Sequence, residues 1–221
     1  MEMEDIIEIN PFHKIKVKYK EPFVLPKVIP LPDVQSILRY AYKTYHDSKT
    51  DYQKECRLRN IIILELLFST GMRVSEISNL KTEQVNLRSN TIQIYGKGSK
   101  ERIACILNKD ISKMIAHYLN IRKHNSEYSF TNKLGNYYSD QSIRYMVNFY
   151  TQAAGVTLHI TPHMFRHTFA TALHDEDVNI RHIQQLLGHS SIVTTQIYTH
   201  ISTNKIRHIL EEKHPRNKFE I

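Results

Sequence analysis

Side chains suited to phosphate chemistry recur at short, ordered intervals in the last third of the chain. His163 and Arg166 are three residues apart, and His189 and Tyr198 follow them. A guanidinium can hold a phosphodiester through paired hydrogen bonds, and imidazoles can move protons near neutral pH. A tyrosine hydroxyl, whose ordinary pKa is about 10, becomes a nucleophile once a base or nearby cations draw off its proton. The chain has 13 tyrosines, so the setting of Tyr198, and not its residue type, makes it a candidate.

His163 and Arg166 are expected on one face at the start of a helix. Thr161 suits the N-cap position, and Pro162 suits the first helical turn. An arginine near the positive end of a helix adds to an anion-binding site. The alternative interpretation is a surface histidine and arginine without a functional partner.

A metal site is not expected in this segment. His163 and His167 lie one helical turn apart, but Met164 stands where the zinc pattern HExxH requires glutamate. No cysteine or acidic cluster stands nearby in the sequence. The sequence therefore predicts no metal cofactor.

Two further cations lie far upstream, each with a simpler alternative role. Arg73 follows an expected helix that ends at Thr70–Gly71, and Glu76 could either pair with it or orient a neighbouring side chain. Lys97 lies in a glycine-flanked turn, where it could be solvated or could donate a proton to a leaving oxygen. The turn is no phosphate-binding P-loop, because no Gly-Lys-Ser/Thr motif opens a helix there.

The periodicity of apolar residues predicts a mainly helical α+β domain that positions these side chains. Alternation over 91–95 and 102–106, around a turn with two glycines, predicts a β-hairpin and thus one small antiparallel sheet. Helices are expected at about 32–42, 55–70, 74–80, 110–122, 139–154, 162–174, 178–188 and 191–211. Residues 1–30, with four prolines and alternating lysines, are expected to form an extended basic linker or arm. Residues 31–221 are expected to form the catalytic domain, with a tail helix at about 200–212.

Composition favours a nucleic-acid partner. Lysine and arginine outnumber aspartate and glutamate by 30 to 22, which gives a formal charge of +8 and a pI near 9.3. The two cysteines, Cys56 and Cys105, have no CxxC spacing and are expected to be buried apolar residues. Residues 1–5 are acidic, unlike a signal peptide, and the apolar run 61–68 is too short to span a bilayer. We therefore expect a soluble, cytoplasmic protein that does not associate with a membrane.

The order of the candidate residues resembles that of the tyrosine recombinases, the phage-integrase and Xer-type family of site-specific DNA recombinases. The matching segments are TGMRVSEI at 70–77, GKGSKER at 96–102, TPHMFRHT at 161–168, LLGHS at 186–190 and YTH at 198–200. They span a catalytic domain from about residue 30 to about residue 215. The resemblance implies the DNA breaking-rejoining fold of that family.

The resemblance also implies a role for each candidate residue. Arg73 and Arg166 would clamp the scissile phosphate, with a third hydrogen bond from His189, while Glu76 has a supporting role. His163 would be the general base, Lys97 the general acid for the departing 5′ oxygen, and Tyr198 the nucleophile that forms a 3′-phosphotyrosyl link. Because one phosphoester replaces another, the reaction would need neither ATP nor a metal ion.

The resemblance implies double-stranded DNA as the partner, with a monomer in the absence of DNA and a homotetramer on it. The tail helix would dock either on its own domain or on a neighbouring protomer. Family members usually carry an N-terminal DNA-clamping domain of about a hundred residues, whereas only some 30 residues precede the first catalytic-domain helix here. The chain would thus be a truncated form or a naturally short member, with weaker duplex binding than a two-domain enzyme.

Two alternative functions remain open at this point. One is DNA relaxation of the type IB topoisomerase kind, which shares the phosphotyrosine chemistry but needs no synapsis of two sites. The other is a non-catalytic DNA-binding regulator with the same fold. A full set of candidate catalytic residues counts against the regulator. The sequence does not indicate the target site or the choice between integration, excision and dimer resolution.

Overall fold

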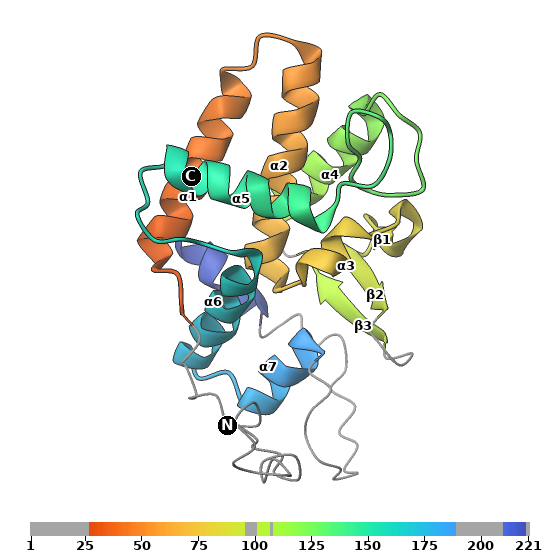
Figure 1. Cartoon of the computed structure of the whole chain (residues 1–221). Helices are drawn as coiled ribbons and strands as arrows, with labels where there is room; N and C mark the ends of the chain where they lie inside the picture. Colours follow the sequence, from red (N-terminus) through yellow and green to blue (C-terminus); the bar gives the residue numbers. More distant parts are fainter. Residues whose placement is uncertain (1–26, 96–100, 107, 189–209, 220–221) are drawn as a thin grey trace, which may run out of the picture.

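The computed structural model describes residues 27–95, 101–106, 108–188 and 210–219, and one long helix runs through its centre (Figure 1). This helix, α2 (Asp51–Thr70), begins four residues before the expected start, because the Thr50 side chain accepts a hydrogen bond from the Gln53 backbone and caps it. It ends at Gly71, in the left-handed conformation expected there. α2 is buried on all sides along its second half, which explains its continuous apolar sequence.

The remaining helices agree in number and order with the sequence expectation over the described residues, and most of them pack on α2. α1 (Leu31–His46) packs along α2, and α5 (Asp140–Ala153) crosses both in Figure 1. The other helices are α3 (Val74–Ser78), α4 (Lys109–Ile121), α6 (Pro162–Asp175) and α7 (Ile180–Leu187). Residues 210–213 are helical, and the 3-10 turn η4 (Pro215–Lys218) follows.

One small antiparallel sheet lies beside the helices. β2 (Thr91–Tyr95) pairs with β3 (Glu101–Cys105), which confirms the predicted hairpin strands. A two-residue strand, β1 (Val85–Asn86), adds an edge that the sequence did not predict, because so short a strand has no periodicity. The strand order is β1-β2-β3, and a 3-10 turn, η3 (Thr82–Gln84), leads into β1. The predicted mainly helical α+β class is therefore confirmed.

The described ends of the chain pack on the same core. Ile29, in the segment expected as a linker, is fully buried, and its backbone N–H donates to the Thr168 hydroxyl. Leu210 and His214 are also buried, so the described part of the tail packs on its own domain. Cys105 is buried as expected, whereas Cys56 is only half-buried.

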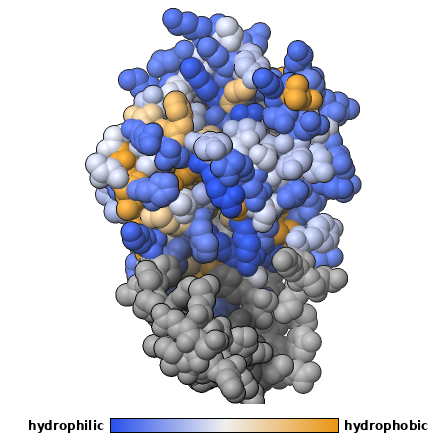
Figure 2. Space-filling model, viewed as in Figure 1, coloured by the Kyte–Doolittle hydropathy of each residue, from blue (hydrophilic) through white to orange (hydrophobic). Residues whose placement is uncertain are grey.

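The outer surface of the described helices is largely polar. The face shown in Figure 2 is mainly hydrophilic, with small hydrophobic patches. On α5, Tyr145 and Phe149 are exposed one helical turn apart. Within the described residues, no helix combines the length and apolar character needed to cross a membrane.

Candidate active site

The carboxylate of Glu76 lies at the centre of the candidate site. Arg73 is the residue before α3, and Glu76 is in the first turn of that helix. The Arg73 backbone N–H donates to Glu76 Oε2 at 2.7 Å, and its guanidinium Nη1 donates to Oε1 at 2.9 Å. Glu76 thus both closes the start of α3 and orients the Arg73 side chain, which combines the two roles left open by the sequence.

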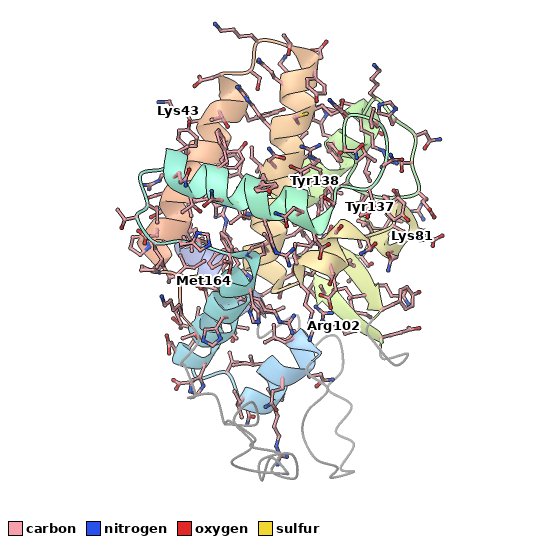
Figure 3. All side chains as sticks on the ribbon, in the orientation of Figure 1. Lys43, Lys81, Arg102, Tyr137, Tyr138 and Met164 are labelled. Carbon is pink, nitrogen blue, oxygen red and sulfur yellow. The ribbon has the colours of Figure 1, made fainter. Side chains whose placement is uncertain are left out.

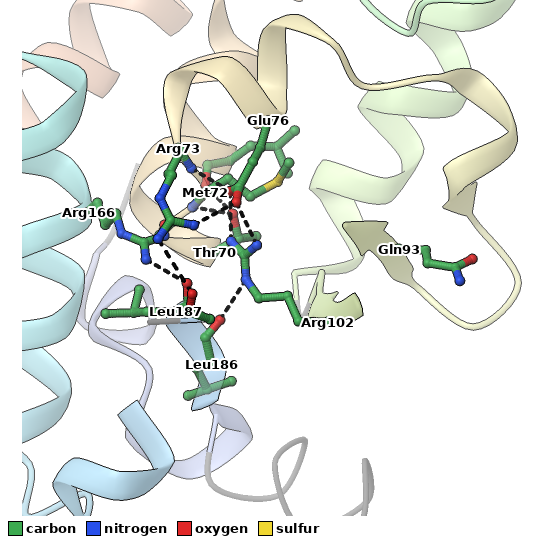
Figure 4. Close-up of polar contacts among 12 residues, drawn as sticks. Thr70, Met72, Arg73, Glu76, Gln93, Arg102, Arg166, Leu186 and Leu187 are labelled. Atoms are coloured by element: carbon green, nitrogen blue, oxygen red, sulfur yellow. Dashed lines mark hydrogen bonds and ion pairs between the residues drawn. The ribbon is translucent and has the colours of Figure 1, made fainter. Parts of the chain in front are cut away.

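Arg102, on β3, reaches the same carboxylate from the sheet. Its Nη1 and Nη2 donate to Oε1 and Oε2 of Glu76, each at 2.8 Å, in a bidentate ion pair (Figure 4). Its Nε donates to the Leu186 carbonyl at 3.0 Å. Figure 3 shows Arg102 between β3 and α7.

Arg102 was not among the candidate residues chosen from the sequence, although a signal for it existed. In the hairpin register Arg102 pairs with Ile94, and Ala104 pairs with Ile92. Ile92, Ile94 and Ala104 are all buried, so period-two alternation places Arg102 on the inward face of the strand. A charged side chain on such a face requires a buried partner, and that requirement predicts a carboxylate nearby.

Arg166, on α6, is buried and donates to two backbone carbonyls. Its Nη1 donates to the Gly71 carbonyl at 2.6 Å, and its Nη2 donates to the Leu187 carbonyl at 2.5 Å. Burial, followed by the charges of Arg73 and Arg102, lowers its pKa to about 10, against an opposing effect of Glu76. Arg166 therefore stays charged at neutral pH, and its guanidinium has more N–H donors than these two carbonyls can use.

Two glycines allow these elements to meet closely. Gly71 ends α2 with φ +60°, and a Cβ there would lie 2.6 Å from the Phe169 ring and 2.8 Å from Leu187. Gly188 ends α7 with φ +62°, and a Cβ there would lie 2.9 Å from Cδ of Arg102. Both positions therefore need glycine for backbone conformation and for space.

The electrostatics of the site favour an anion. Among the described residues, the guanidinium groups of Arg73, Arg102 and Arg166 lie near one carboxylate, that of Glu76 (Figure 4). Burial would raise the pKa of Glu76, but Arg102 and then Arg73 outweigh this effect and lower it. Glu76 therefore stays ionised, and three cations beside one anion leave a positive excess that a phosphate can neutralise. The side chain of Arg73 is the most accessible of the three guanidinium groups, at 42% exposed.

His163 lies at the start of α6 as expected, but with a different exposure from Arg166. His163 is exposed, whereas Arg166 points into the domain. His163 lies close enough to His167 to act on it: burial and then the His163 charge lower the pKa of His167. No cluster of three potential metal ligands occurs among the described residues.

The other three candidate residues, Lys97, His189 and Tyr198, lie outside the described residues. The described chain stops on either side of Lys97, at Tyr95 and Glu101, and again at Gly188, directly before His189. The site residues that the structure brings together are thus Arg73, Glu76 and Arg166, together with Arg102.

Two solved recombinase structures share this architecture. The crystal structure of XerA recombinase superposes with a TM-score of 0.65 at 29% identity, covering 88% of this chain and 68% of XerA. XerH, a site-specific recombinase solved with its difH substrate before cleavage, gives a TM-score of 0.65 at 26% identity over 76% of this chain and 48% of XerH. The fold is that of a tyrosine recombinase catalytic domain.

Sequence comparisons agree with the structural ones. A tyrosine recombinase of Agathobacter rectalis is 50% identical over 99% of this chain and 72% of its own length. Tyrosine recombinase XerC of Staphylococcus aureus is 34% identical over 96% of this chain and 69% of its own length. The pattern that defines the phage integrase family matches residues 32–205. The chain therefore belongs to the phage integrase family of tyrosine recombinases, which confirms the resemblance seen in the sequence.

Proposed function

We propose that this protein is a site-specific DNA recombinase that cleaves and rejoins strands through a 3′-phosphotyrosyl intermediate. The observation that carries the proposal is that Arg73 and Arg166, 93 positions apart in the numbering, lie close enough for their charges to interact. Arg73 is held by the Glu76 carboxylate, and Arg166 is held by the carbonyls of Gly71 and Leu187. Two guanidinium groups held in fixed positions suit the charge that builds up on a phosphate in transfer reactions. The DNA-bound state of XerH and the charge of +8 support duplex DNA as the partner.

In the proposed reaction Tyr198 attacks the scissile phosphorus. The phenolic oxygen forms a bond to phosphorus while the bond from phosphorus to the 5′ oxygen breaks. His163 takes the phenolic proton, and Lys97 gives a proton to the departing 5′ oxygen. Arg73, Arg166 and His189 hold the non-bridging oxygens, with Glu76 in support.

The energy of the broken phosphodiester bond is retained in this scheme, because the bond is exchanged for a phosphotyrosine bond. The reverse attack by a 5′ hydroxyl on the phosphotyrosine then rejoins the strand. No ATP or metal ion enters either step. We propose a homotetramer on DNA for the exchange between two duplexes.

The buried position of Arg166 assigns unequal tasks to the two arginines. Arg166 is 5% exposed and tied to two carbonyls, so its donors point in fixed directions before DNA binds. Arg73 is more accessible and is oriented through its own Glu76 contact. In the proposal Arg73 therefore meets the phosphate first, and Arg166 completes the clamp.

The test is to trap the covalent intermediate on nicked duplexes whose core sequence is randomised. Cleavage near the nick releases a short fragment, which prevents religation and leaves an adduct stable in SDS. Sequencing of the trapped DNA would identify the target site, with Tyr198→Phe as the control. Absence of a Tyr198-dependent adduct would contradict the proposed recombinase function. Relaxation of a supercoiled plasmid that carries the site, without joining of two sites, would instead indicate topoisomerase-like activity.

A further inference from the structure

Arg102 contacts two parts of the site that are far apart in sequence. It donates to both oxygens of Glu76, in α3, and to the carbonyl of Leu186, in α7. We propose that Arg102 is a positioning residue for strand cleavage, which sets the orientation of Arg73 and fixes the end of α7. This inference rests on the recombinase function proposed above.

The first line of evidence is the chain of contacts from Arg102 to Arg73. The two side chains share Glu76 Oε1, which accepts from Nη1 of Arg102 at 2.8 Å and from Nη1 of Arg73 at 2.9 Å. The Arg102 and Glu76 side chains are only 10% and 9% exposed, so their geometry is shielded from water. A carboxylate held from the sheet side by a bidentate guanidinium presents a fixed edge to Arg73.

The second line of evidence is the C-terminal end of α7. The last carbonyls of a helix have no partners within the helix. Here Arg102 binds the Leu186 carbonyl, and Arg166 binds the Leu187 carbonyl. Gly188 follows with no room for a Cβ beside Arg102. Since His189 is the next residue, Arg102 fixes the point from which the chain continues to a proposed phosphate ligand.

The third line of evidence is the charge balance. Glu76 would be satisfied by Arg73 alone if it served only to cap α3. Arg102 adds a second cation, whose side chain is only 10% exposed, and its charge contributes to the lowered pKa of Arg166. Like charges at close range are unfavourable unless an anion also binds. The arrangement therefore fits a site that is completed by a phosphate better than it fits a simple ion pair.

The experiment measures cleavage and binding separately on the nicked duplex identified by the trapping selection. The variants are Arg102→Lys, Arg102→Met, Glu76→Gln and the double variant Arg102→Met/Glu76→Gln. For both single Arg102 variants we expect the single-turnover cleavage rate to fall by about 10- to 100-fold, as when outer partners of functional side chains are removed. Lysine keeps the charge but lacks the planar fork, so it should not rescue the rate. The Kd for the duplex should change little.

The double variant tests whether Arg102 acts through Glu76. If the two residues work as one unit, the double variant should cleave no more slowly than the slower single variant. Arg88→Met is the matched control, since Arg88 is exposed in the turn before β2 of the same sheet and should cleave like the wild type. Circular dichroism melts establish that each variant is folded at the assay temperature. If Arg102→Met is not folded, Arg102→Lys takes its place in the test.

The outcomes separate the two proposals. If the wild-type protein forms the Tyr198-dependent adduct and the folded Arg102 variants cleave at the same rate as the wild type, the positioning role is overturned. The recombinase proposal then still stands. A loss of duplex binding as large as the loss of cleavage would also overturn it, because Arg102 would then act in binding. Failure of the wild type to form a Tyr198-dependent adduct would overturn both.

Discussion

The guanidinium of Arg166 donates a hydrogen bond of 2.6 Å to the carbonyl of Gly71, across 95 positions in the sequence. This bond joins α6 to the turn that leads into Arg73, so the two proposed phosphate ligands are mechanically connected. A second bond ties Arg166 to the end of α7. The orientation of Arg166 is therefore set by the protein before any phosphate arrives.

Replacing Arg166 with lysine should impair cleavage far more than it impairs folding. An ammonium cannot hold two carbonyls and a phosphate with the geometry of a planar guanidinium. We expect the single-turnover cleavage rate to fall by about 100- to 1,000-fold, as for loss of a transition-state donor. Arg88→Lys, on the exposed turn, is the control. Cleavage at the wild-type rate by Arg166→Lys would contradict the assigned role.

Gly71→Ala should destabilise the protein through both backbone strain and overpacking. The residue has φ +60°, and the added Cβ would lie 2.6 Å from Phe169 and 2.8 Å from Leu187. We expect the free energy of unfolding in urea titrations to fall by about 2 to 4 kcal/mol.

Gly155→Ala is a matched control for this experiment. Gly155 has φ +76°, but a Cβ added there would have no atom within 4 Å, so an alanine at this position introduces backbone strain without overpacking. We expect a loss of about 1 to 2 kcal/mol there. Equal losses for the two alanine variants would show that close packing at Gly71 contributes nothing.

Arg216→Met should strongly destabilise the attachment of the tail. Nε of Arg216 donates to Glu65 Oε2 at 3.0 Å, and Nη2 donates to Oε1 at 3.1 Å, while the Glu65 side chain is fully buried. Tyr42 would remain as a hydrogen-bond donor to Glu65, but the buried charge would lose its cation. The expected loss in the free energy of unfolding is about 3 to 5 kcal/mol.

Two comparison variants isolate the cause of that loss. Arg216→Met combined with Glu65→Gln removes the uncompensated charge and should regain part of the stability. Lys113→Met disrupts the exposed pair with Asp110 and should cost less than about 1 kcal/mol. If the double variant were as unstable as Arg216→Met alone, burial of an unpaired charge would not be the cause.

Stability should fall as the pH drops from about 6.5 to about 4, because of His214. Nε2 of His214 donates to the Ser69 carbonyl at 2.8 Å, and Nδ1 accepts from the Arg216 backbone N–H at 3.0 Å, so the ring is neutral. Burial lowers its pKa to about 4; the bond to Ser69 opposes this shift, and the charge of Arg216 adds to it.

The direction of this pH dependence follows from the difference in proton binding between the unfolded and the folded protein. The unfolded chain takes up the proton near pH 6.5, whereas the folded protein takes it up only near pH 4. The contribution of neutral His214 to the free energy of unfolding is therefore fully present above pH 6.5 and is lost by pH 4. Its upper limit is about 3 kcal/mol. Urea titrations across this range should show a shallower pH dependence for His214→Gln than for the wild type. The same slope in both proteins would exclude His214 as the source.

Local sequence signals predicted the described elements well where they were strong. The hairpin strands, the helix end at Gly71 and the helix from Pro162 follow from alternation, from glycine and from a proline in the first turn. The predicted start of α2 was wrong by four residues. The first turns of this helix lie at the surface, so the residues after Thr50 are polar and show no apolar periodicity. Periodicity detects burial, and exposed helical turns carry little of it.

The sequence by itself determined the family and named Arg73, Lys97 and Arg166 as candidate cations for phosphate chemistry. It could do so because residue type and order along the chain carry that information. Only the tertiary structure decided how these cations are held: Glu76 serves Arg73 and Arg102 together, and Arg166 is anchored on two backbone carbonyls. These contacts join α3, β3, α6 and α7, and their formation depends on how the elements pack around α2. Spacing along the chain cannot encode distances between elements that meet only in the folded core.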